Sequence, residues 1–162
     1  MQDEVDRLIE AWQRERPDLD YDSLAVLSRV SRLARHLDRA RKATFAAHQL
    51  EAYEFDVLTA LRRAGQPFEM SPGELIAQTL VSSGTMTNRI DRLERRGFVE
   101  RRPDPYDGRG VRVRLAARGR HQIDGAFAEL LEREAALLAD LTPRQRSTVA
   151  AALRVVLAPF DS

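Results

Sequence analysis

The stretch SPGELIAQTLVSSGTMTNRIDRLERRG, residues 71–97 of a chain of 162, decides the fold. Its first four residues combine an N-cap serine, a first-turn proline and a glutamate three residues after the cap. They predict a short helix that ends near Thr79. Ser82 or Ser83 caps a second helix, which ends at Gly97. A short helix, a tight turn and a second helix are the arrangement of a helix-turn-helix.

The second helix has two different faces. Met86, Ile90 and Leu93 recur at a helical spacing that directs them inward, whereas small polar residues lie off this stripe. Small hydroxyl and amide groups near a helix N-terminus can approach phosphates and base edges. An ordinary α+β segment with a solvated basic face is the alternative interpretation.

Two short strands are predicted at residues 98–102 and 111–115, on either side of the turn-rich residues 103–110. This β-hairpin is a candidate wing, and Arg109 stands between two glycines, in a tip slim enough to enter a minor groove. The residues predicted to contact double-stranded DNA are therefore Ser82, Ser83, Thr85, Thr87, Asn88 and Arg92 in the helix, with Arg109 and Arg112 in the hairpin.

Longer helices are predicted on both sides of this unit. Their expected ranges are about 5–16, 22–47, 52–63 and 117–140, with a last helix opened by a capping box at Thr142 that ends near Pro159. The fold class is mainly α with a small β-hairpin. We expect N-terminal helices for dimerisation and a ligand lid at 1–50, a DNA-binding lobe at 51–118 and C-terminal dimerisation helices at 119–162.

Charge is distributed unevenly, although the formal net charge is only +1. Residues 85–120 hold 11 Arg against 5 Asp and Glu, and the remainder of the chain is acidic. A basic segment that coincides with the helix-turn-helix and the hairpin favours a polyanionic partner such as DNA.

Composition excludes several classes of function. The chain has no cysteine and three histidines, which argues against thiolate metal sites, redox switches and histidine-rich metal sites. No Gly-rich phosphate loop, catalytic triad or metal-ligand cluster stands out, so we expect no enzyme activity and no cofactor. No stretch reaches the roughly 20 apolar residues of a membrane span. The acidic N-terminus lacks the order of a signal peptide, and a cytoplasmic protein is expected.

Residues 71–119 resemble the winged helix-turn-helix of the MarR family of bacterial transcription regulators. The hairpin sequence DPYDGR at 104–109 is similar to that family's acidic-then-basic wing signature, and LAARG at 115–119 is similar to its post-wing Leu-Thr-x-x-Gly. Two residues depart from the pattern: Gly108 replaces a basic residue and Ala116 replaces a threonine. The helical flanks extend the resemblance over nearly the whole chain, and it implies a regulator of transcription.

The resemblance also implies a homodimer, and the sequence supports one independently. Two copies of a reader helix about 10 bp apart can read a palindrome. The terminal helices carry apolar residues that a small winged domain cannot cover alone, among them Leu19, Leu24, Leu27, Leu130, Leu131, Leu137, Leu138, Val149, Leu153, Val156 and Leu157. A monomer in which these residues form internal core is the alternative.

Three residues are unusual for a scaffold. Asp56 lies in a helix that is apolar nearly all round, where a carboxylate is expected to be partly buried and to need a partner. Arg89 lies at the edge of the inward stripe and points more towards the protein body than Asn88. Trp12 is the only tryptophan. A core anchor at Trp12 and a buried Asp56–Arg89 ion pair are the structural alternatives.

The N-terminal helix with its tryptophan is similar to the urate-responsive subgroup of the family. That resemblance implies a ligand site formed by Trp12, Asp56, Arg89 and Arg101; Arg102 is adjacent to the last of these. A flat purine can stack on an indole, and its anionic oxygens suit a guanidinium. The expected protein is a repressor released by a small anionic aromatic ligand such as urate. A MarR-type regulator of another effector, phenolic or antibiotic, and an effector-independent architectural DNA-binding protein remain alternatives.

Overall fold

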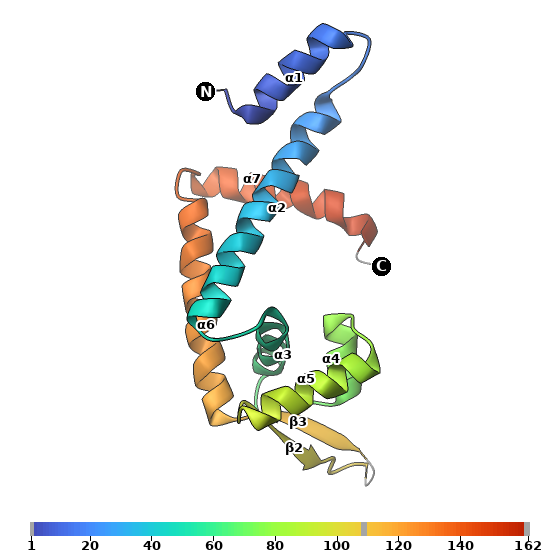
Figure 1. The fold of residues 1–162 in the computed structure, drawn as a ribbon, viewed down its shortest axis with the longest axis vertical. Coiled ribbons are helices and arrows are strands. Elements are labelled where there is room, and N and C mark those ends of the chain that lie inside the picture. The colour runs from blue at the N-terminus through green and yellow to red at the C-terminus, as the bar shows by residue number, and fades with distance from the viewer. Residues whose placement is uncertain (1, 108–109, 161–162) are drawn as a thin grey trace. The chain divides into compact units, whose positions relative to one another are not determined.

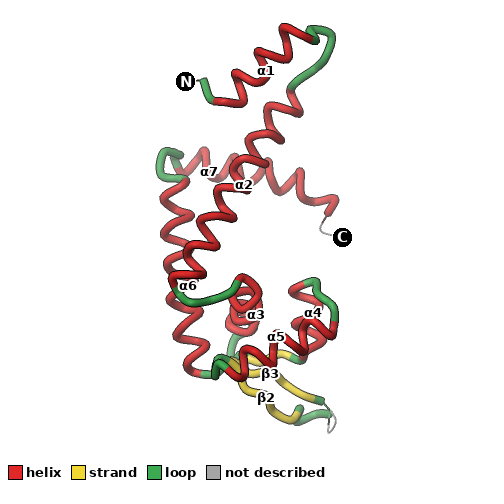
Figure 2. The backbone as a smooth tube through the Cα atoms, in the orientation of Figure 1, coloured by secondary structure: helices red, strands yellow, loops and turns green. Residues whose placement is uncertain are grey.

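The computed structural model describes residues 2–107 and 110–160, and it divides into two compact units, Met1–Ala43 and Thr44–Ser162. Figure 1 labels the helices and strands, and Figure 2 shows that helices make up most of the chain. Among the described helices, none is long and apolar enough to cross a membrane.

The first unit is a pair of helices, α1 (Glu4–Glu15) and the greater part of α2 (Asp22–Ala47). Helix α1 starts where expected because Asp3 caps it: its Oδ1 accepts from the backbone N–H groups of Val5 (2.8 Å) and Asp6 (2.9 Å). The helix ends before Pro17, and the Tyr21 hydroxyl donates to the carbonyl of Arg16 at 2.8 Å.

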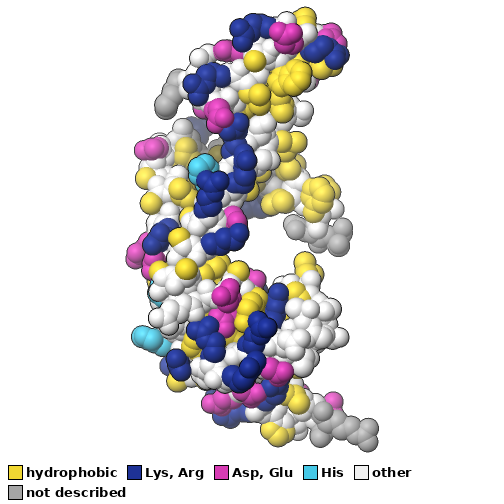
Figure 3. All heavy atoms as spheres, in the orientation of Figure 1, with side chains coloured by type: hydrophobic (Ala, Val, Ile, Leu, Met, Phe, Trp, Pro, Cys, Tyr) yellow, Lys and Arg dark blue, Asp and Glu magenta, His cyan; other side chains and the backbone are white. Residues whose placement is uncertain are grey.

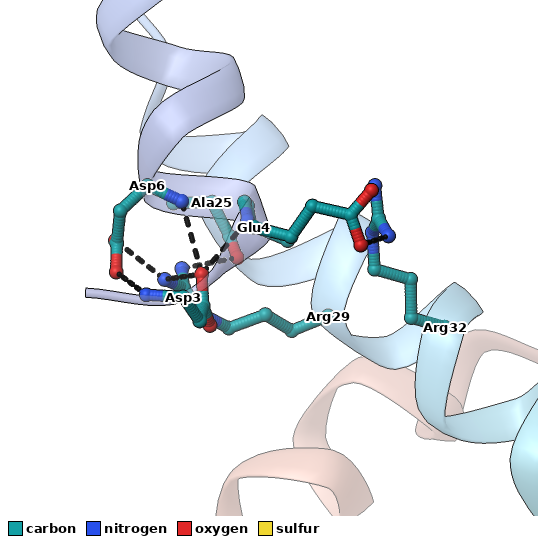
Figure 4. Close-up of polar contacts among 7 residues, drawn as sticks. Asp3, Glu4, Asp6, Ala25, Arg29 and Arg32 are labelled. Atoms are coloured by element: carbon teal, nitrogen blue, oxygen red, sulfur yellow. Dashed lines mark hydrogen bonds and ion pairs between the residues drawn. The ribbon is translucent and has the colours of Figure 1, made fainter. Parts of the chain in front are cut away.

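Ion pairs hold α1 against α2, as Figure 4 shows. The Arg29 guanidinium lies 2.8 Å from Asp3 Oδ2 and 2.6 Å from Asp6 Oδ1, and Arg32 pairs with Glu4. The hydrogen bond from Arg29, with backbone hydrogen bonds from Asp6 and Val5, lowers the pKa of Asp3 to about 2. The first unit is therefore fastened by charges near its surface.

The second unit holds the remaining elements. Their order is α3 (Ala52–Arg63), β1 (Glu69–Met70), α4 (Pro72–Thr79), α5 (Ser83–Arg95), β2 (Val99–Pro103), β3 (Val111–Leu115), α6 (Ala117–Leu137) and α7 (Pro143–Leu157), followed by a 3-10 turn at Ala158–Phe160. The predicted DNA-binding lobe, 51–118, and the predicted C-terminal helices, 119–162, both fall inside this unit.

The sheet has three antiparallel strands in the order β1-β3-β2. Strands β2 and β3 form the predicted hairpin, with Val99 opposite Leu115 and Pro103 opposite Val111. Strand β1 was not predicted, because two residues are too few to show a strand periodicity; it exists because Met70 pairs with Val113, far along the chain. Helix α6 ends at Leu137, a few residues before the expected 140.

One hydrophobic core joins α3 to α6 and the sheet, and α7 contributes no buried residue to it. It includes Val57, Leu58 and Leu61 of α3, with further fully buried side chains from α4, α5, the sheet and α6: Leu75, Met86, Leu93, Val113 and Ile123. Helix α4 packs against α5, and α3 packs against α6. The core thus supports one face of α5 and leaves the other face exposed.

Candidate nucleic-acid interface

Helix α5 is positioned by its cap and by its buried stripe. Ser82 is the N-cap, and its Oγ accepts from the backbone N–H of Thr85 at 3.4 Å. Leu80 adopts a left-handed conformation, φ 53°, which ends α4 and allows the tight turn. Met86 and Ile90 are buried, as predicted. The cap and the buried stripe therefore fix the orientation of α5, and its opposite face stays exposed.

The residues predicted to contact DNA in this helix share an exposed position. Ser82, Ser83, Thr85, Thr87, Asn88 and Arg92 are all exposed. The Thr87 hydroxyl donates to the carbonyl of Ser83 at 3.1 Å, which holds it close to the helix backbone. In Figure 3, Lys and Arg side chains gather over the C-terminal part of α5, whereas white, uncharged groups cover its N-terminal part.

Arg101 connects the hairpin to α5. From strand β2 its guanidinium forms ion pairs with both Asp91 and Glu94 of α5, and its backbone N–H donates to Glu94 Oε1 at 3.1 Å. Asp91 and Glu94 lie three residues apart and so project from the same side of the helix. Arg101 therefore adds a polar link between strand β2 and helix α5, beside the core residues Leu93 and Val99 that both elements bury.

Arg112 connects the hairpin to α4. Its Nη1 lies 2.9 Å from Glu74 Oε2, and its Nη2 donates to the carbonyl of Glu69 at 3.3 Å. Hydrogen bonds from the backbone and hydroxyl of Ser71, with the positive charge of Arg112, lower the pKa of Glu74. A contact between Arg112 and DNA stays a prediction. Arg109, the predicted contact at the hairpin tip, lies outside the described residues.

The four residues predicted for the ligand site lie on different elements. Trp12 is half exposed, on α1 of the first unit. In the second unit, Arg89 is half-buried where Asn88 is exposed, as expected, and its guanidinium carbon lies 5.2 Å from the centre of the Tyr53 ring. Asp56 lines a cavity of about 310 Å³ between α3 and α4.

The expectation that Asp56 is partly buried is wrong. Asp56 is exposed, because it shares the outer stripe of α3 with Arg63, two turns along the helix. The buried carboxylate of α3 is Glu54, whose side chain is 1% exposed and pairs with Arg96 at the end of α5. Arg96 also donates to the carbonyl of Gln49 at 2.7 Å and lies 4.5 Å from the Phe98 ring.

Sequence reasoning missed Glu54, Arg96 and the carboxylate partners of Arg101. A signal for Glu54 was present: it stands three residues after Glu51, the position of a capping box, and its Oε2 accepts from the Glu51 N–H at 3.0 Å. Within residues 2–107 and 110–160, no group of three or more His, Cys, Asp and Glu could hold a metal ion.

A short helix, a tight turn and an exposed second helix, with a β-hairpin fastened beside it, define a winged helix-turn-helix protein. A family model described as the MarR family matches residues 48–110. The HTH-type transcriptional regulator PecS of Dickeya dadantii is 34% identical over 150 residues, which cover 93% of this chain and 90% of PecS.

Solved structures agree with this class. A mutant MarR from E. coli complexed with operator DNA has a TM-score of 0.65 and 28% identity, over 85% of this chain and 97% of that one. A MarR family protein from Bacillus stearothermophilus, at 22% identity, shares the fold with a TM-score of 0.75 over 89% of this chain and 99% of its own. The chain belongs to the MarR family. These relatives confirm the prediction of a transcription regulator rather than an enzyme.

Proposed function

We propose that the protein is a repressor of transcription that binds a palindromic operator as a homodimer and is released by a small anionic aromatic ligand such as urate. The observation that carries the proposal is the exposed polar face of α5, backed by a buried stripe and tied to the hairpin by Arg101. Its small hydroxyl and amide groups suit base edges in a major groove, and its arginines suit phosphates. The relative from E. coli binds operator DNA.

Uncovered apolar side chains support the dimer. Helix α7 has no buried residue, although Val149, Val156 and Leu157 are large and apolar. A helix of 15 residues is marginal in water when nothing covers its apolar face. A second copy of the chain would cover α7 and would place two α5 helices on successive half-sites.

The ligand is proposed to act on Trp12, Asp56, Arg89 and Arg101. An anionic group can compete with the carboxylates that hold Arg101, or draw Arg89 from the Tyr53 ring, and either change would disturb the setting of α5. The ligand shifts the equilibrium only through its preference for the geometry that does not bind DNA.

Fluorescence anisotropy tests the proposal on labelled DNA from upstream of the protein's own gene, against scrambled DNA at ~150 mM salt, with and without urate. Tight, specific binding that urate reverses is expected. Arg109→Ala is expected to weaken binding and to lower the salt slope by about one unit. Because Trp12 is the only tryptophan, its fluorescence gives a direct second reading of ligand binding.

The alternatives give different results. Specific DNA binding that is unaffected by urate but is reversed by a phenolic compound or an antibiotic would identify a repressor with a different effector. Similar affinity for all sequences, with a steep salt dependence, would identify an architectural DNA-binding protein. A normal urate response in Trp12→Phe, Asp56→Asn and Arg89→Ala alike would remove these residues from the ligand site.

A further inference from the structure

The second unit contains a pocket on the side of the sheet that faces away from the core. We call it the outer-sheet pocket; its volume is about 300 Å³, and its lining includes Pro67, Phe68, Glu100, Arg102, Arg114 and Arg120. Val99 and Val113 are buried on the core side of the same strands, whereas Glu100, Arg102 and Arg114 alternate with them and line the pocket. Leu115 and Phe68, which also line it, contact the core.

Positive charge exceeds negative charge in the outer-sheet pocket. Arg102, Arg114 and Arg120 line it, against one carboxylate, Glu100. Glu100 is already held by Arg102, whose Nη2 lies 2.9 Å from its Oε2. On β3, Arg114 lies opposite Glu69 of β1 on one side and opposite Glu100 of β2 on the other.

Arg114 and Arg120 form no ion pair within the described parts of the chain. The guanidinium carbon of Arg120 instead lies 5.9 Å from the centre of the Phe68 ring. This differs from Arg101 and Arg112, which are both paired with carboxylates. Two guanidinium groups that form no ion pair with a described carboxylate, at the wall of one pocket, are suited to bidentate hydrogen bonds with an oxyanion.

The start of α6 adds hydrogen-bond donors at the rim of the pocket. Its N-cap, Ala116, has no side chain that could accept from the first-turn N–H groups, and the first turn has no acidic residue. The helix is pressed against the sheet here, since a Cβ on Gly119 would come 2.2 Å from the Phe98 carbonyl oxygen. The positive end of a helix of 21 residues thus reinforces the arginines.

We propose that the outer-sheet pocket binds a phosphate group. Phosphate carries up to two negative charges and presents oxygens that two guanidinium groups and backbone N–H groups can share. The pocket is larger than one phosphate, and Pro67 with Phe68 gives it an apolar wall for an attached group. The phosphate belongs either to a small phosphomonoester or to a DNA backbone that continues beyond the operator.

Isothermal titration in phosphate-free buffer tests the first source, with pyrophosphate and AMP as probes and adenosine as the probe without phosphate. Saturable binding of pyrophosphate and AMP, but not of adenosine, is expected. Arg114→Gln and Arg120→Gln are each expected to weaken it about tenfold. Arg118→Gln is the matched control, because Arg118 shares the first turn of α6 with Arg120 but does not line the pocket. This variant should bind pyrophosphate and AMP as the unchanged protein does.

The DNA backbone is tested with two duplexes, the bare binding site and the same site extended by about one helical turn, about 10 bp, on each side. If the backbone is the source, Arg114→Gln and Arg120→Gln weaken binding to the extended duplex alone, and lower its salt slope. Equal thermal unfolding midpoints of all variants establish that the fold is intact. The proposal is overturned if the pocket variants match Arg118→Gln in both experiments.

Discussion

The pairing of Glu54 with Arg96 makes an asymmetric prediction about stability. The Glu54 side chain is 1% exposed and that of Arg96 is 34% exposed, so one partner can turn to water and the other cannot. Replacing Arg96 by Met leaves a buried carboxylate whose remaining hydrogen bond comes from the Glu51 N–H. Replacing Glu54 by Gln removes the charge but keeps an acceptor oxygen for the same donors.

The magnitudes follow from this burial. Breaking a buried ion pair from one side costs about 3–5 kcal/mol, and the exposure of Arg96 places Arg96→Met at the lower end, about 3 kcal/mol. Glu54→Gln should cost about 1 kcal/mol, the usual net value of a weakened hydrogen bond. For a chain of this size these costs correspond to unfolding midpoints lowered by roughly 9 °C and roughly 3 °C.

Urea and thermal unfolding followed by far-UV circular dichroism measure both variants, at one fixed protein concentration because assembly also changes the midpoint. The double variant completes the cycle and should cost less than the sum of the two single changes. If Arg96→Met destabilises the protein no more than Glu54→Gln, Glu54 does not depend on Arg96 and the reasoning fails.

Three further outcomes are expected. Arg101→Met should weaken DNA binding about fivefold, because losing two half-exposed ion pairs costs about 1 kcal/mol, while helix content stays unchanged. Unchanged affinity in the anisotropy assay would show that the hairpin does not need this link to α5. Gly119→Ala should cost about 2–3 kcal/mol in urea unfolding because its Cβ would meet the Phe98 carbonyl, and Gly84→Ala, whose Cβ meets nothing within 4 Å, is the control. Since the pKa of Asp3 is lowered from 3.8 to about 2, the stability that Asp3 contributes to the first unit is complete above pH 3.8 and is lost as the pH falls towards 2. Trp12 fluorescence should report this loss, and an Asp3→Asn variant that titrates identically would contradict the prediction.

Local chemistry made the helices predictable. Ser71, Ser82 and Thr142 each accept a hydrogen bond from the backbone N–H three residues ahead. The sequence alone therefore located the starts of α4 and α7, and it left the cap of α5 between Ser82 and its neighbour Ser83. Gly97 was predicted as a helix stop and has the positive φ, 69°, that such a stop requires. These features depend on neighbours within a few residues.

Features that depend on distant neighbours were not predictable. Strand β1 needs β3 as its partner, and nothing at Glu69 or Met70 announces it. In α3 the choice between Glu54 and Asp56 as the buried carboxylate depends on which side α5 occupies, because Arg96 arrives from the end of that helix. The exposed face of α5 was predictable because its buried stripe shows the full helical period.

The link through Arg101 also has an electrostatic side. Asp91 and Glu94 are carboxylates on the helix that is proposed to approach DNA, where they would repel phosphates at close range. Arg101 supplies the positive charge that balances them from strand β2. The field around α5 is therefore a joint property of helix and hairpin: a variant without the Arg101 guanidinium would leave two negative charges on α5 without this counter-charge, and attraction to the nucleic acid would weaken even if every direct contact were kept.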